Sequence, residues 1–220
     1  SCDMEAKELI ARRVAQELKE GYIVNLGIGL PTMVPKFLPT DVHITLQSEN
    51  GFLGMGPLEG EPQPGVVNAG GIPCGLLPGA AIFDSLMSFA LIRGGHVDLT
   101  VLGGLQVDQE GNLANWMVPG KMVPGMGGAM DLVSGAKKVV VAMEHCTREG
   151  EPRILKRCNL PLTAKARVSM IVTELAVFTI DDGQLVLQET APGISLEQVR
   201  ASTEADFVLA EQFHSMSVAA

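Results

Sequence analysis

The stretch Lys138-Val139-Val140-Val141-Ala142-Met143 decides the fold of this chain. After the first residue its side chains are apolar at every position, so both faces of the strand that it predicts need cover, as in a parallel sheet. Other apolar runs predict further buried strands over residues 22–26, 43–47 and 99–102.

Helical patterns lie between and around these runs. A helix over residues 5–20, with Gly21 as its stop, is predicted by apolar side chains at helical spacing, at Leu9, Ile10, Val14 and Leu18. Three more helices are expected: one that begins near Pro31, one over residues 83–92, and one opened by the capping box Ser195-Leu196-Glu197-Gln198.

Strands that alternate with helices predict an α/β fold, with an open, mainly parallel sheet and helices on both of its faces. Asp181-Asp182-Gly183, between two strand-like runs, adds a C-terminal hairpin. No linker or repeat is visible, so we expect a single domain over residues 1–220. Residues 51–79 and 103–128 are rich in Gly and Pro without periodicity, and we expect them to be long functional loops.

The composition narrows the class of protein. Hydrophobic residues make up 46% of the 220 residues and charged residues 19%, which is enough apolar material for a sizeable core. The formal net charge of −9 disfavours nucleic acid as a partner, because phosphate binding requires clustered Lys and Arg. An anionic ligand would have to be held by local backbone N–H groups or by another chain.

Cysteine usage and hydropathy predict a cytoplasmic location without membrane association. The cysteines form no C-x-x-C pair, which disfavours a disulfide framework or a zinc site, and no metal-ligand spacing links the histidines. No apolar run reaches the length of a membrane span. Ser1-Cys2-Asp3 precede Met4, and we expect Met4 to be the natural start and residues 1–3 to be an expression remnant.

Glu49 lies in Gln47-Ser48-Glu49-Asn50-Gly51, where the predicted strand over residues 43–47 ends. Asn-Gly readily adopts positive φ in a tight turn. Such a turn can hold a carboxylate rigidly at the C-terminal edge of a sheet, where open α/β folds bind their ligands. Spacing alone leaves two interpretations open, a fixed nucleophile and a solvated turn residue, of which the second is the commoner.

Three glycine clusters are candidate ligand contacts, and each is also consistent with an ordinary turn. Gly27-Ile28-Gly29 follows a strand and precedes a helix, so its amides can face an anion, but it lacks the third glycine of a dinucleotide fingerprint. Gly103-Gly104 stands at another strand end. Gly125-Met126-Gly127-Gly128-Ala129 is denser and lets backbone N–H groups approach a reacting atom, as an oxyanion site requires.

Two further motifs are interpreted as structural. Arg93-Gly94-Gly95-His96 is typical of a helix end rather than of a ligand clamp. Glu144-His145-Cys146 suggests Cys-His chemistry, but adjacent side chains diverge, whereas a nucleophile and its base must meet in space. No G-x-S-x-G motif is present, which disfavours a serine hydrolase.

In their order along the chain, the motifs resemble those of the B subunits of class I (3-oxoacid) CoA-transferases. The resemblance extends from about Met4 to past Phe207, and Ser48-Glu49-Asn50-Gly51 is its most specific part. The other motifs that carry it are Asn25-Leu26-Gly27-Ile28-Gly29-Leu30-Pro31-Thr32, Ile92-Arg93-Gly94-Gly95-His96, Asn112-Leu113-Ala114-Asn115-Trp116, Pro119-Gly120-Lys121 and Gly125-Met126-Gly127-Gly128-Ala129-Met130-Asp131.

The resemblance implies an enzyme with Glu49 as its nucleophile and Gly128 as the source of one oxyanion-hole N–H group. It implies covalent, ping-pong catalysis through a glutamyl-CoA thioester, with no metal or redox cofactor and with the CoA thioester as a substrate. Asn25, Gly27 and Gly29 are implied to lie along the pantetheine arm of CoA. Some relatives carry a lysine after Asn-Ala-Gly. Here Gly71 follows Asn68-Ala69-Gly70, so the side chain for that CoA contact is missing.

The same resemblance implies a partner chain, the A subunit of the CoA-transferase, which supplies the second oxyanion donor, commonly in an A2B2 heterotetramer. The expected substrates are succinyl-CoA or acetyl-CoA and a short-chain carboxylic acid, with acetoacetate favoured as one acid and 3-oxoadipate as an alternative. Two other functions stay open: an acyl-CoA hydrolase that uses the same anhydride, and a noncatalytic ligand-sensing module on the same scaffold.

Overall fold

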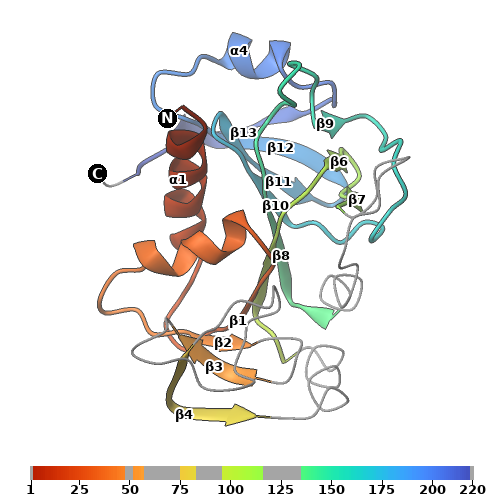
Figure 1. The fold of residues 1–220 in the computed structure, drawn as a ribbon. Helices are drawn as coiled ribbons and strands as arrows, with labels where there is room; N and C mark the ends of the chain where they lie inside the picture. Colours follow the sequence, from red (N-terminus) through yellow and green to blue (C-terminus); the bar gives the residue numbers. More distant parts are fainter. Residues whose placement is uncertain (1, 48–51, 57–74, 83–95, 116–134, 219–220) are drawn as a thin grey trace.

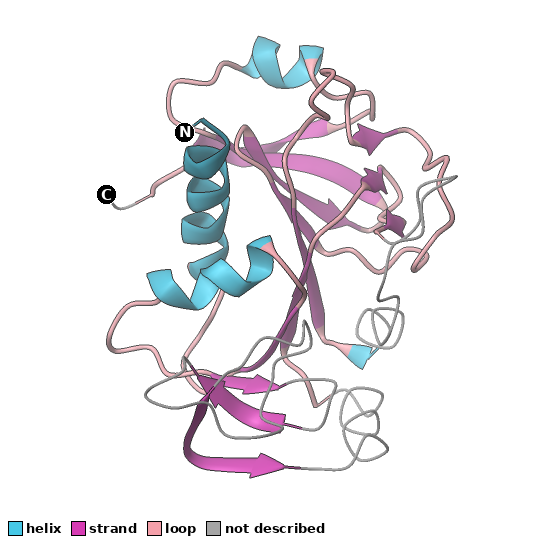
Figure 2. Cartoon of the chain, in the orientation of Figure 1, coloured by secondary structure: helices cyan, strands magenta, loops and turns pink. Residues whose placement is uncertain are grey.

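The structure, a computed structural model, describes residues 2–47, 52–56, 75–82, 96–115 and 135–218 (Figure 1). A strongly twisted ten-stranded sheet extends through the described part of the molecule (Figure 2). Its strands, in spatial order, are β13 (Val208–Ser215), β12 (Gln184–Thr190), β11 (Ala176–Asp181), β10 (Met170–Val172), β8 (Lys138–Ala142), β5 (Leu99–Leu102), β1 (Ile23–Leu26), β2 (Thr45–Gln47), β3 (Phe52–Gly56) and β4 (Gly75–Ile82).

The centre of the sheet is parallel, and its two ends are mixed. Strands β2, β1, β5, β8 and β10 pair with one another in parallel, whereas β2 pairs antiparallel with β3, and β10 with β11. At one end β3 and β4 pair antiparallel, and at the other β11 and β12 do so, followed by a parallel β12–β13 pair. The predicted α/β class with an open, mainly parallel sheet is therefore confirmed, with the parallel pairing concentrated in the middle.

Strand β8 separates two hydrophobic clusters. Val139 and Val141 belong to one cluster, whereas Val140 and Ala142 belong to the other, and none of the four is more than 2% exposed. This alternation follows from the pleat, which points successive side chains to opposite faces. An apolar residue at every position therefore buries both faces of the strand, as the sequence predicts.

Two helices cover one face of the sheet: α1 (Cys2–Ala15) and the 3₁₀ helix η1 (Leu30–Phe37), which lie together on the left in Figure 1. Ile10, Val14 and Val34 are fully buried in the cluster on this side. The η1 helix has a proline in its first turn, as predicted from Pro31.

The opposite face is covered by α4 (Leu196–Ala201) and by a three-stranded sheet of β7 (Leu113–Ala114), β6 (Gln106–Asp108) and β9 (Ile154–Leu155). Helices thus lie on both faces, but the small sheet is a cover that the sequence did not predict. Strands β3, β6 and β7 and the first five residues of β4 lie inside the two segments expected to be loops, so that expectation is wrong for them. Strands β3, β6 and β7 have five residues or fewer, which leaves too few positions for a period of two to show. Strand β4 is longer but contains Gly75, Pro78 and Gly79, residue types that are unusual inside a strand.

The C-terminal hairpin and the last helix are confirmed. Asp182 and Gly183 both have positive φ, 48° and 75°, which is the turn that suits the twist of two antiparallel strands. At α4 the Ser195 side chain accepts a hydrogen bond from the Gln198 N–H, and the Gln198 side chain accepts one from the Ser195 N–H.

The first helix ends five residues earlier than the prediction of residue 20. After Ala15 the chain tightens into three-residue turns, in which the N–H groups of Gln16 and Glu17 reach the carbonyls of Arg13 and Val14. Gly21 has φ +80°, but its N–H donates to the carbonyl of His43, which precedes β2. Gly21 therefore joins the segment before β1 to the segment before β2 and does not cap the helix.

A buried ion pair joins α1 to β12. The Arg13 guanidinium donates to both carboxylate oxygens of Glu189, at 3.0 and 2.6 Å, and also to Glu17 at 2.8 Å. Lys138, at the start of β8, donates to the other Glu17 oxygen at 2.8 Å. Burial works against the charge on Glu17, but its hydrogen bonds with Arg13 and Lys138 outweigh this and lower its pKa. The network therefore ties one helix to two strands that are far apart in sequence.

The helix predicted over residues 83–92 lies outside the described residues. Within the residues that the structure describes, no helix has the length and apolar character needed to cross a membrane.

Candidate active site

Three neighbouring parallel strands end at one edge of the sheet. Strand β1 lies between β2 and β5, so the last residues of the three strands, Leu26, Gln47 and Leu102, lie at the same edge. In open α/β folds this carboxyl edge is where ligands bind. The Gly27-Ile28-Gly29 and Gly103-Gly104 clusters of the sequence both stand there.

Glu49 and Gly128, the two predicted catalytic residues, lie outside the described residues, as do Gly71 and Arg93 of the predicted motifs. The structure places the strand that leads to the first of them: β2 ends at Gln47, two residues before Glu49 in the sequence. The predicted strand over residues 43–47 is confirmed for its last three residues.

Asn25 on β1 is hydrogen-bonded to Gln47. The two residues are register partners, and the Asn25 Nδ2 group donates to the Gln47 backbone oxygen at 2.9 Å and to its Oε1 oxygen at 2.7 Å. Both residues are 2% exposed. Because two oxygens face the same atom, only the NH₂ side of the Asn25 amide fits there.

A row of polar residues crosses the three strands at this level. Thr100 on β5 is the register partner of Asn25, so Thr100, Asn25 and Gln47 stand side by side across β5, β1 and β2. Thr100 is fully buried, and its hydroxyl has no hydrogen-bond partner within the described part of the chain. The sequence analysis missed this row, although a polar residue inside the apolar run of residues 22–26 is a signal for it.

The Gly27-Ile28-Gly29 turn follows β1 directly, and its two glycines differ in what they meet. The Gly27 N–H donates to the Val101 carbonyl at 2.8 Å, and a Cβ at Gly27 would stand 3.3 Å from that oxygen. Gly29 has φ +82°, a conformation that L side chains rarely adopt. Between them Ile28 is 59% exposed, which leaves an apolar side chain in solvent beside the strand edge.

His145 and Cys146 do not form a catalytic pair. Both ring nitrogens of the fully buried His145 are 2.8 Å from threonine hydroxyls, those of Thr173 and Thr203, and burial lowers its pKa to about 4. The Cys146 sulfur faces the Ser202 carbonyl instead, and burial raises the pKa of this thiol. The structural interpretation of this motif is therefore confirmed.

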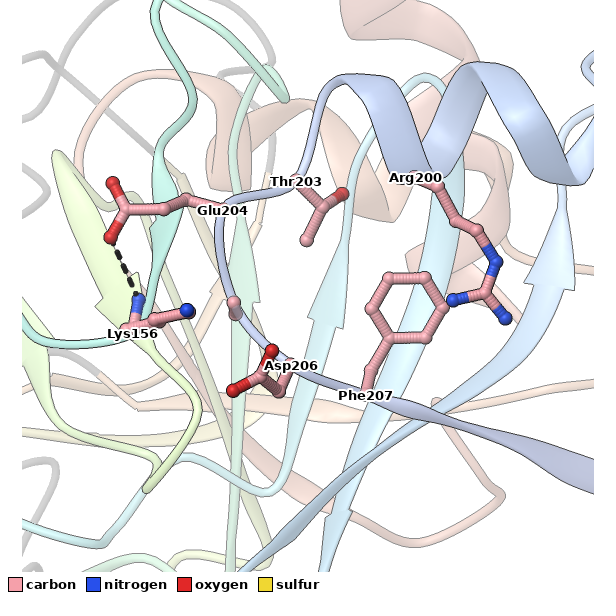
Figure 3. A pocket seen from close by; sticks show the side chains of 7 residues that line it. Lys156, Arg200, Thr203, Glu204, Asp206 and Phe207 are labelled. Atoms are coloured by element: carbon pink, nitrogen blue, oxygen red, sulfur yellow. Dashed lines mark hydrogen bonds between the residues drawn. The ribbon is translucent and has the colours of Figure 1, made fainter.

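No group of three or more metal-ligating side chains occurs in the described ranges. A hollow lies on the other side of the molecule, near α4, where Figure 3 shows Lys156, Arg200, Glu204 and Phe207 around it. Two of its charged groups have local contacts: the Arg200 guanidinium stands 5.0 Å from the centre of the Phe207 ring, and the Glu204 carboxylate accepts from the Lys156 backbone N–H. The hollow brings no nucleophile together with a base.

A family model described as coenzyme A transferase matches residues 7–202, so the chain belongs to the coenzyme A transferase family. It is an enzyme of this family and of the type called the B or beta subunit. The beta subunit of the acetate CoA-transferase of Escherichia coli (strain K12) is 66% identical over 212 residues, which cover 96% of this chain and 98% of that protein.

The B subunit of the succinyl-CoA:3-ketoacid coenzyme A transferase of Helicobacter pylori (strain ATCC 700392 / 26695) is 53% identical. That match covers 91% of this chain and 98% of that protein. Among solved structures, an acyl-CoA transferase apoenzyme from Escherichia coli O157:H7 superposes with a TM-score of 0.78 at 22% identity. The superposition covers 96% of this chain and 43% of that one, and it supports the fold.

Proposed function

We propose that the chain is the catalytic B subunit of an enzyme that moves CoA between an acyl-CoA and a short-chain carboxylic acid, with Glu49 as the nucleophile. One observation carries the proposal: Ser48-Glu49-Asn50-Gly51 follows directly on β2, at the carboxyl edge of the parallel strands, in a chain of this family. A carboxylate at that edge, on a turn rich in residues that adopt positive φ, can be held in one orientation.

The proposed reaction proceeds through two covalent species. The Glu49 carboxylate attacks the thioester carbonyl, the C–S bond breaks, and CoA leaves as the thiolate. That thiolate then attacks the glutamyl carbonyl of the acyl-glutamyl anhydride, which releases the first acid as its carboxylate and leaves a glutamyl-CoA thioester. A second carboxylate reverses these steps and departs as the new acyl-CoA. Covalent catalysis of this kind gives ping-pong kinetics and needs no metal or redox cofactor.

The tetrahedral intermediate carries an oxyanion that needs preorganised donors. We assign the Gly128 N–H as one donor, and the other donor is assigned to a side chain of a separate A subunit. The relatives named as beta and B subunits support a partner chain, and an A2B2 assembly in the cytoplasm is our proposal. A chain with a net charge of −9 can still bind anionic CoA if the A subunit provides the cationic surface.

For CoA, we propose that the Gly27-Ile28-Gly29 turn lies along the pantetheine arm. The exposed Ile28 supports this, because an apolar side chain in solvent at a ligand-binding edge can be covered by an extended ligand. Asn25 is implied to lie along this arm too by the family resemblance, but it is 2% exposed with its Nδ2 group bonded to Gln47, so we assign it no contact with CoA. Contacts remote from the thioester matter because their binding energy can lower the barrier at the reacting carbon.

For the acids, the 66% identical relative favours acetate and acetyl-CoA as one acid and its thioester. The 53% identical relative keeps succinyl-CoA with a 3-ketoacid such as acetoacetate as the second choice. An initial-rate panel, in which the assembled complex is given one acyl-CoA and each acid in turn, ranks these pairs by their kcat/KM values.

The test of the chemistry uses the assembled A·B complex. Incubation with acyl-CoA, followed by proteolysis and mass spectrometry, is expected to yield a CoA adduct on the peptide that contains Glu49. Glu49→Gln is the matched control, since it keeps the size of the side chain but loses the nucleophilic oxygen. Glu49→Asp withdraws the carboxylate by about 1 Å, which can cost ~10²-fold in rate. An active Glu49→Gln complex, or a wild-type complex without adduct, refutes the proposal.

The same experiment separates the alternative functions. An acyl-CoA hydrolase releases CoA at a rate that does not depend on a second acid. A ligand-sensing module binds acyl-CoA and exchanges no acyl group. A transferase releases little free CoA with or without the acceptor acid, and it forms the new acyl-CoA only when that acid is added. Its double-reciprocal plots are parallel, as ping-pong kinetics requires.

A further inference from the structure

We propose that Asn25 is a positioning residue for the nucleophile: its side-chain amide fixes the end of β2, from which the chain continues into Ser48-Glu49-Asn50-Gly51. This inference rests on the proposed function of Glu49. It assigns Asn25 an action through Gln47, separate from any contact with CoA.

The geometry joins one amide group to both parts of one residue. The Nδ2 group of Asn25 holds the backbone oxygen of Gln47 at 2.9 Å and the side-chain oxygen at 2.7 Å. A bond to the backbone oxygen fixes the plane of the peptide that joins Gln47 to Ser48, and the bond to Oε1 fixes the Gln47 side chain. The last residue of β2 is therefore fixed by a neighbouring strand, beyond the ladder pairing.

Covalent distance carries this constraint to the nucleophile. Two residues of extended chain span at most about 7 Å, so the Glu49 backbone lies within that distance of the residue that Asn25 holds. Misplacement of a reacting group by about 1 Å can cost ~10²-fold in rate. A small shift of the Gln47 carbonyl is therefore enough to slow the attack on the thioester.

The choice of residue in β1 supports a specific role. Asn is depleted in strands, and a buried amide costs free energy unless it is hydrogen-bonded. An apolar residue would suit a 2% exposed position in this four-residue strand better. A residue type that does not suit the helix or strand in which it lies is most often found at a functional site. Thr100, the neighbour of Asn25 in this row, is also buried, but its hydroxyl has no hydrogen-bond partner among the described residues. The two hydrogen bonds from Asn25 to Gln47 are therefore a feature of Asn25 and not of every buried polar residue in the row.

The test compares Asn25→Asp with Thr100→Val in the assembled A·B complex. Asn25→Asp keeps the size of the side chain but replaces the donating NH₂ group by an oxygen that repels both Gln47 oxygens. Thr100→Val is the matched control in the same polar row, on the next strand. Three quantities are measured: the single-turnover rate of CoA-adduct formation on Glu49, the Kd of the complex for CoA, and the Tm.

For Asn25→Asp we expect the adduct rate to fall about 10- to 100-fold, while the Kd for CoA changes less than about threefold. Thr100→Val is expected to keep the wild-type adduct rate. A second variant, Gln47→Met, removes the side-chain amide of Gln47 but keeps the backbone acceptor, and it is expected to slow adduct formation less than Asn25→Asp. This variant keeps the test decisive if Asn25→Asp does not fold.

Three results overturn the inference: a wild-type adduct rate in both Asn25→Asp and Gln47→Met, a loss of rate matched by an equal loss of CoA affinity, or an equal loss in Thr100→Val. The second of these would make Asn25 a CoA contact only. Failure of the proposed function is seen separately, because the wild-type complex then forms no adduct on Glu49 at all.

Discussion

His145 is kept neutral by the residues around it. The Thr203 hydroxyl donates to the Val199 carbonyl at 2.7 Å, so it can only accept from the His145 Nε2–H. The Thr173 hydroxyl, which accepts from two backbone N–H groups, can donate to Nδ1. The neutral ring is thus fully hydrogen-bonded, whereas a second proton on Nδ1 would meet a hydroxyl that is already an acceptor twice.

This environment predicts acid lability. Burial lowers the pKa of His145 from 6.5 to about 4, so the unfolded chain takes up a proton at a pH where the folded chain does not. The contribution to stability is complete above pH 6.5 and is lost as the pH falls from 6.5 to about 4, by about 3 kcal/mol in all. Urea unfolding at a series of pH values measures it.

The matched variants for that experiment are His145→Leu and His96→Gln. His145→Leu removes the titrating ring and is expected to flatten the slope of stability between pH 6.5 and 4. His96 is exposed, so His96→Gln is expected to keep the wild-type slope. A wild-type slope in His145→Leu contradicts the assignment.

Gly103 and Gly104 are neighbours with opposite tolerance for a side chain. A Cβ at Gly104 would lie 2.9 Å from Val141 Cγ1 and 3.1 Å from Met143 Sδ, whereas a Cβ at Gly103 would meet nothing within 4 Å. We expect Gly104→Ala to destabilise the fold by about 1–3 kcal/mol, through overpacking, and Gly103→Ala to change it by less than about 0.5 kcal/mol. Denaturant midpoints of the two variants decide this, and equal midpoints contradict it.

At the scale of elements, the Arg13–Glu189 pair makes the docking of α1 on β12 sensitive to charge. Arg13→Met leaves the buried Glu189 carboxylate without its cation, and we expect a cost of about 3–5 kcal/mol. The double variant Arg13→Met/Glu189→Met is expected to recover most of that loss, because no uncompensated charge remains on β12. Thermal and chemical unfolding of the single and double variants give these differences.

Lys137→Met is the control for charge removal as such. The Lys137–Asp98 pair is solvated, with the lysine side chain 66% exposed, so its loss is expected to cost no more than about 1 kcal/mol. An Arg13→Met variant as stable as Lys137→Met would show that the buried pair does not hold α1.

The elements that could be predicted from the sequence are those whose pattern is decided locally. Strand β8 is apolar on both faces, and α4 carries its own capping box, so neither assignment depended on distant residues. Strand β13 was missed because nearly all of its side chains are exposed, which leaves no apolar alternation to read. The end of α1 was misplaced because the residues that follow Ala15 are held by distant groups, and the local pattern does not include these groups. Lys138, for example, donates a hydrogen bond to Glu17.

The site divides in the same way. Glu49 and Gly128 were selected by motifs that are local in sequence, and their roles stay predictions. The Asn25–Gln47 clamp joins residues 22 positions apart and depends on the register of two strands, which no local pattern specifies. A polar residue inside a buried strand was the visible signal, and its partner became identifiable only from the pairing.

At the scale of the whole molecule, the central strands of the sheet separate two hydrophobic clusters. One cluster lies under α1 and η1, and the other lies under α4 and the small sheet. Because β8 contributes alternate residues to both clusters, we expect a substitution that shifts β8 to disturb the packing of both. The Gly104→Ala clash with Val141 is an example, since it presses on this strand from the side of the small sheet.

The partners of α1 have a consequence for the order of folding. Besides its packing against η1 and the central strands, α1 and the residues just after it are held by hydrogen bonds to groups that come late in the chain: Lys138, Glu189 and the Ser217 carbonyl. A helix of 14 residues is marginal in water without tertiary contacts. Although it leaves the ribosome before them, α1 therefore completes its burial only once the C-terminal strands are in place.

Pulsed hydrogen exchange during refolding can observe this delay. The amides of α1 are expected to gain protection together with those of β12 or after them, because non-local contacts form only once the intervening chain is ordered. Protection of α1 in a phase before β8 and β12 would contradict that order. If the delay holds, synthesis leaves this early segment unprotected until the C-terminal strands have been added.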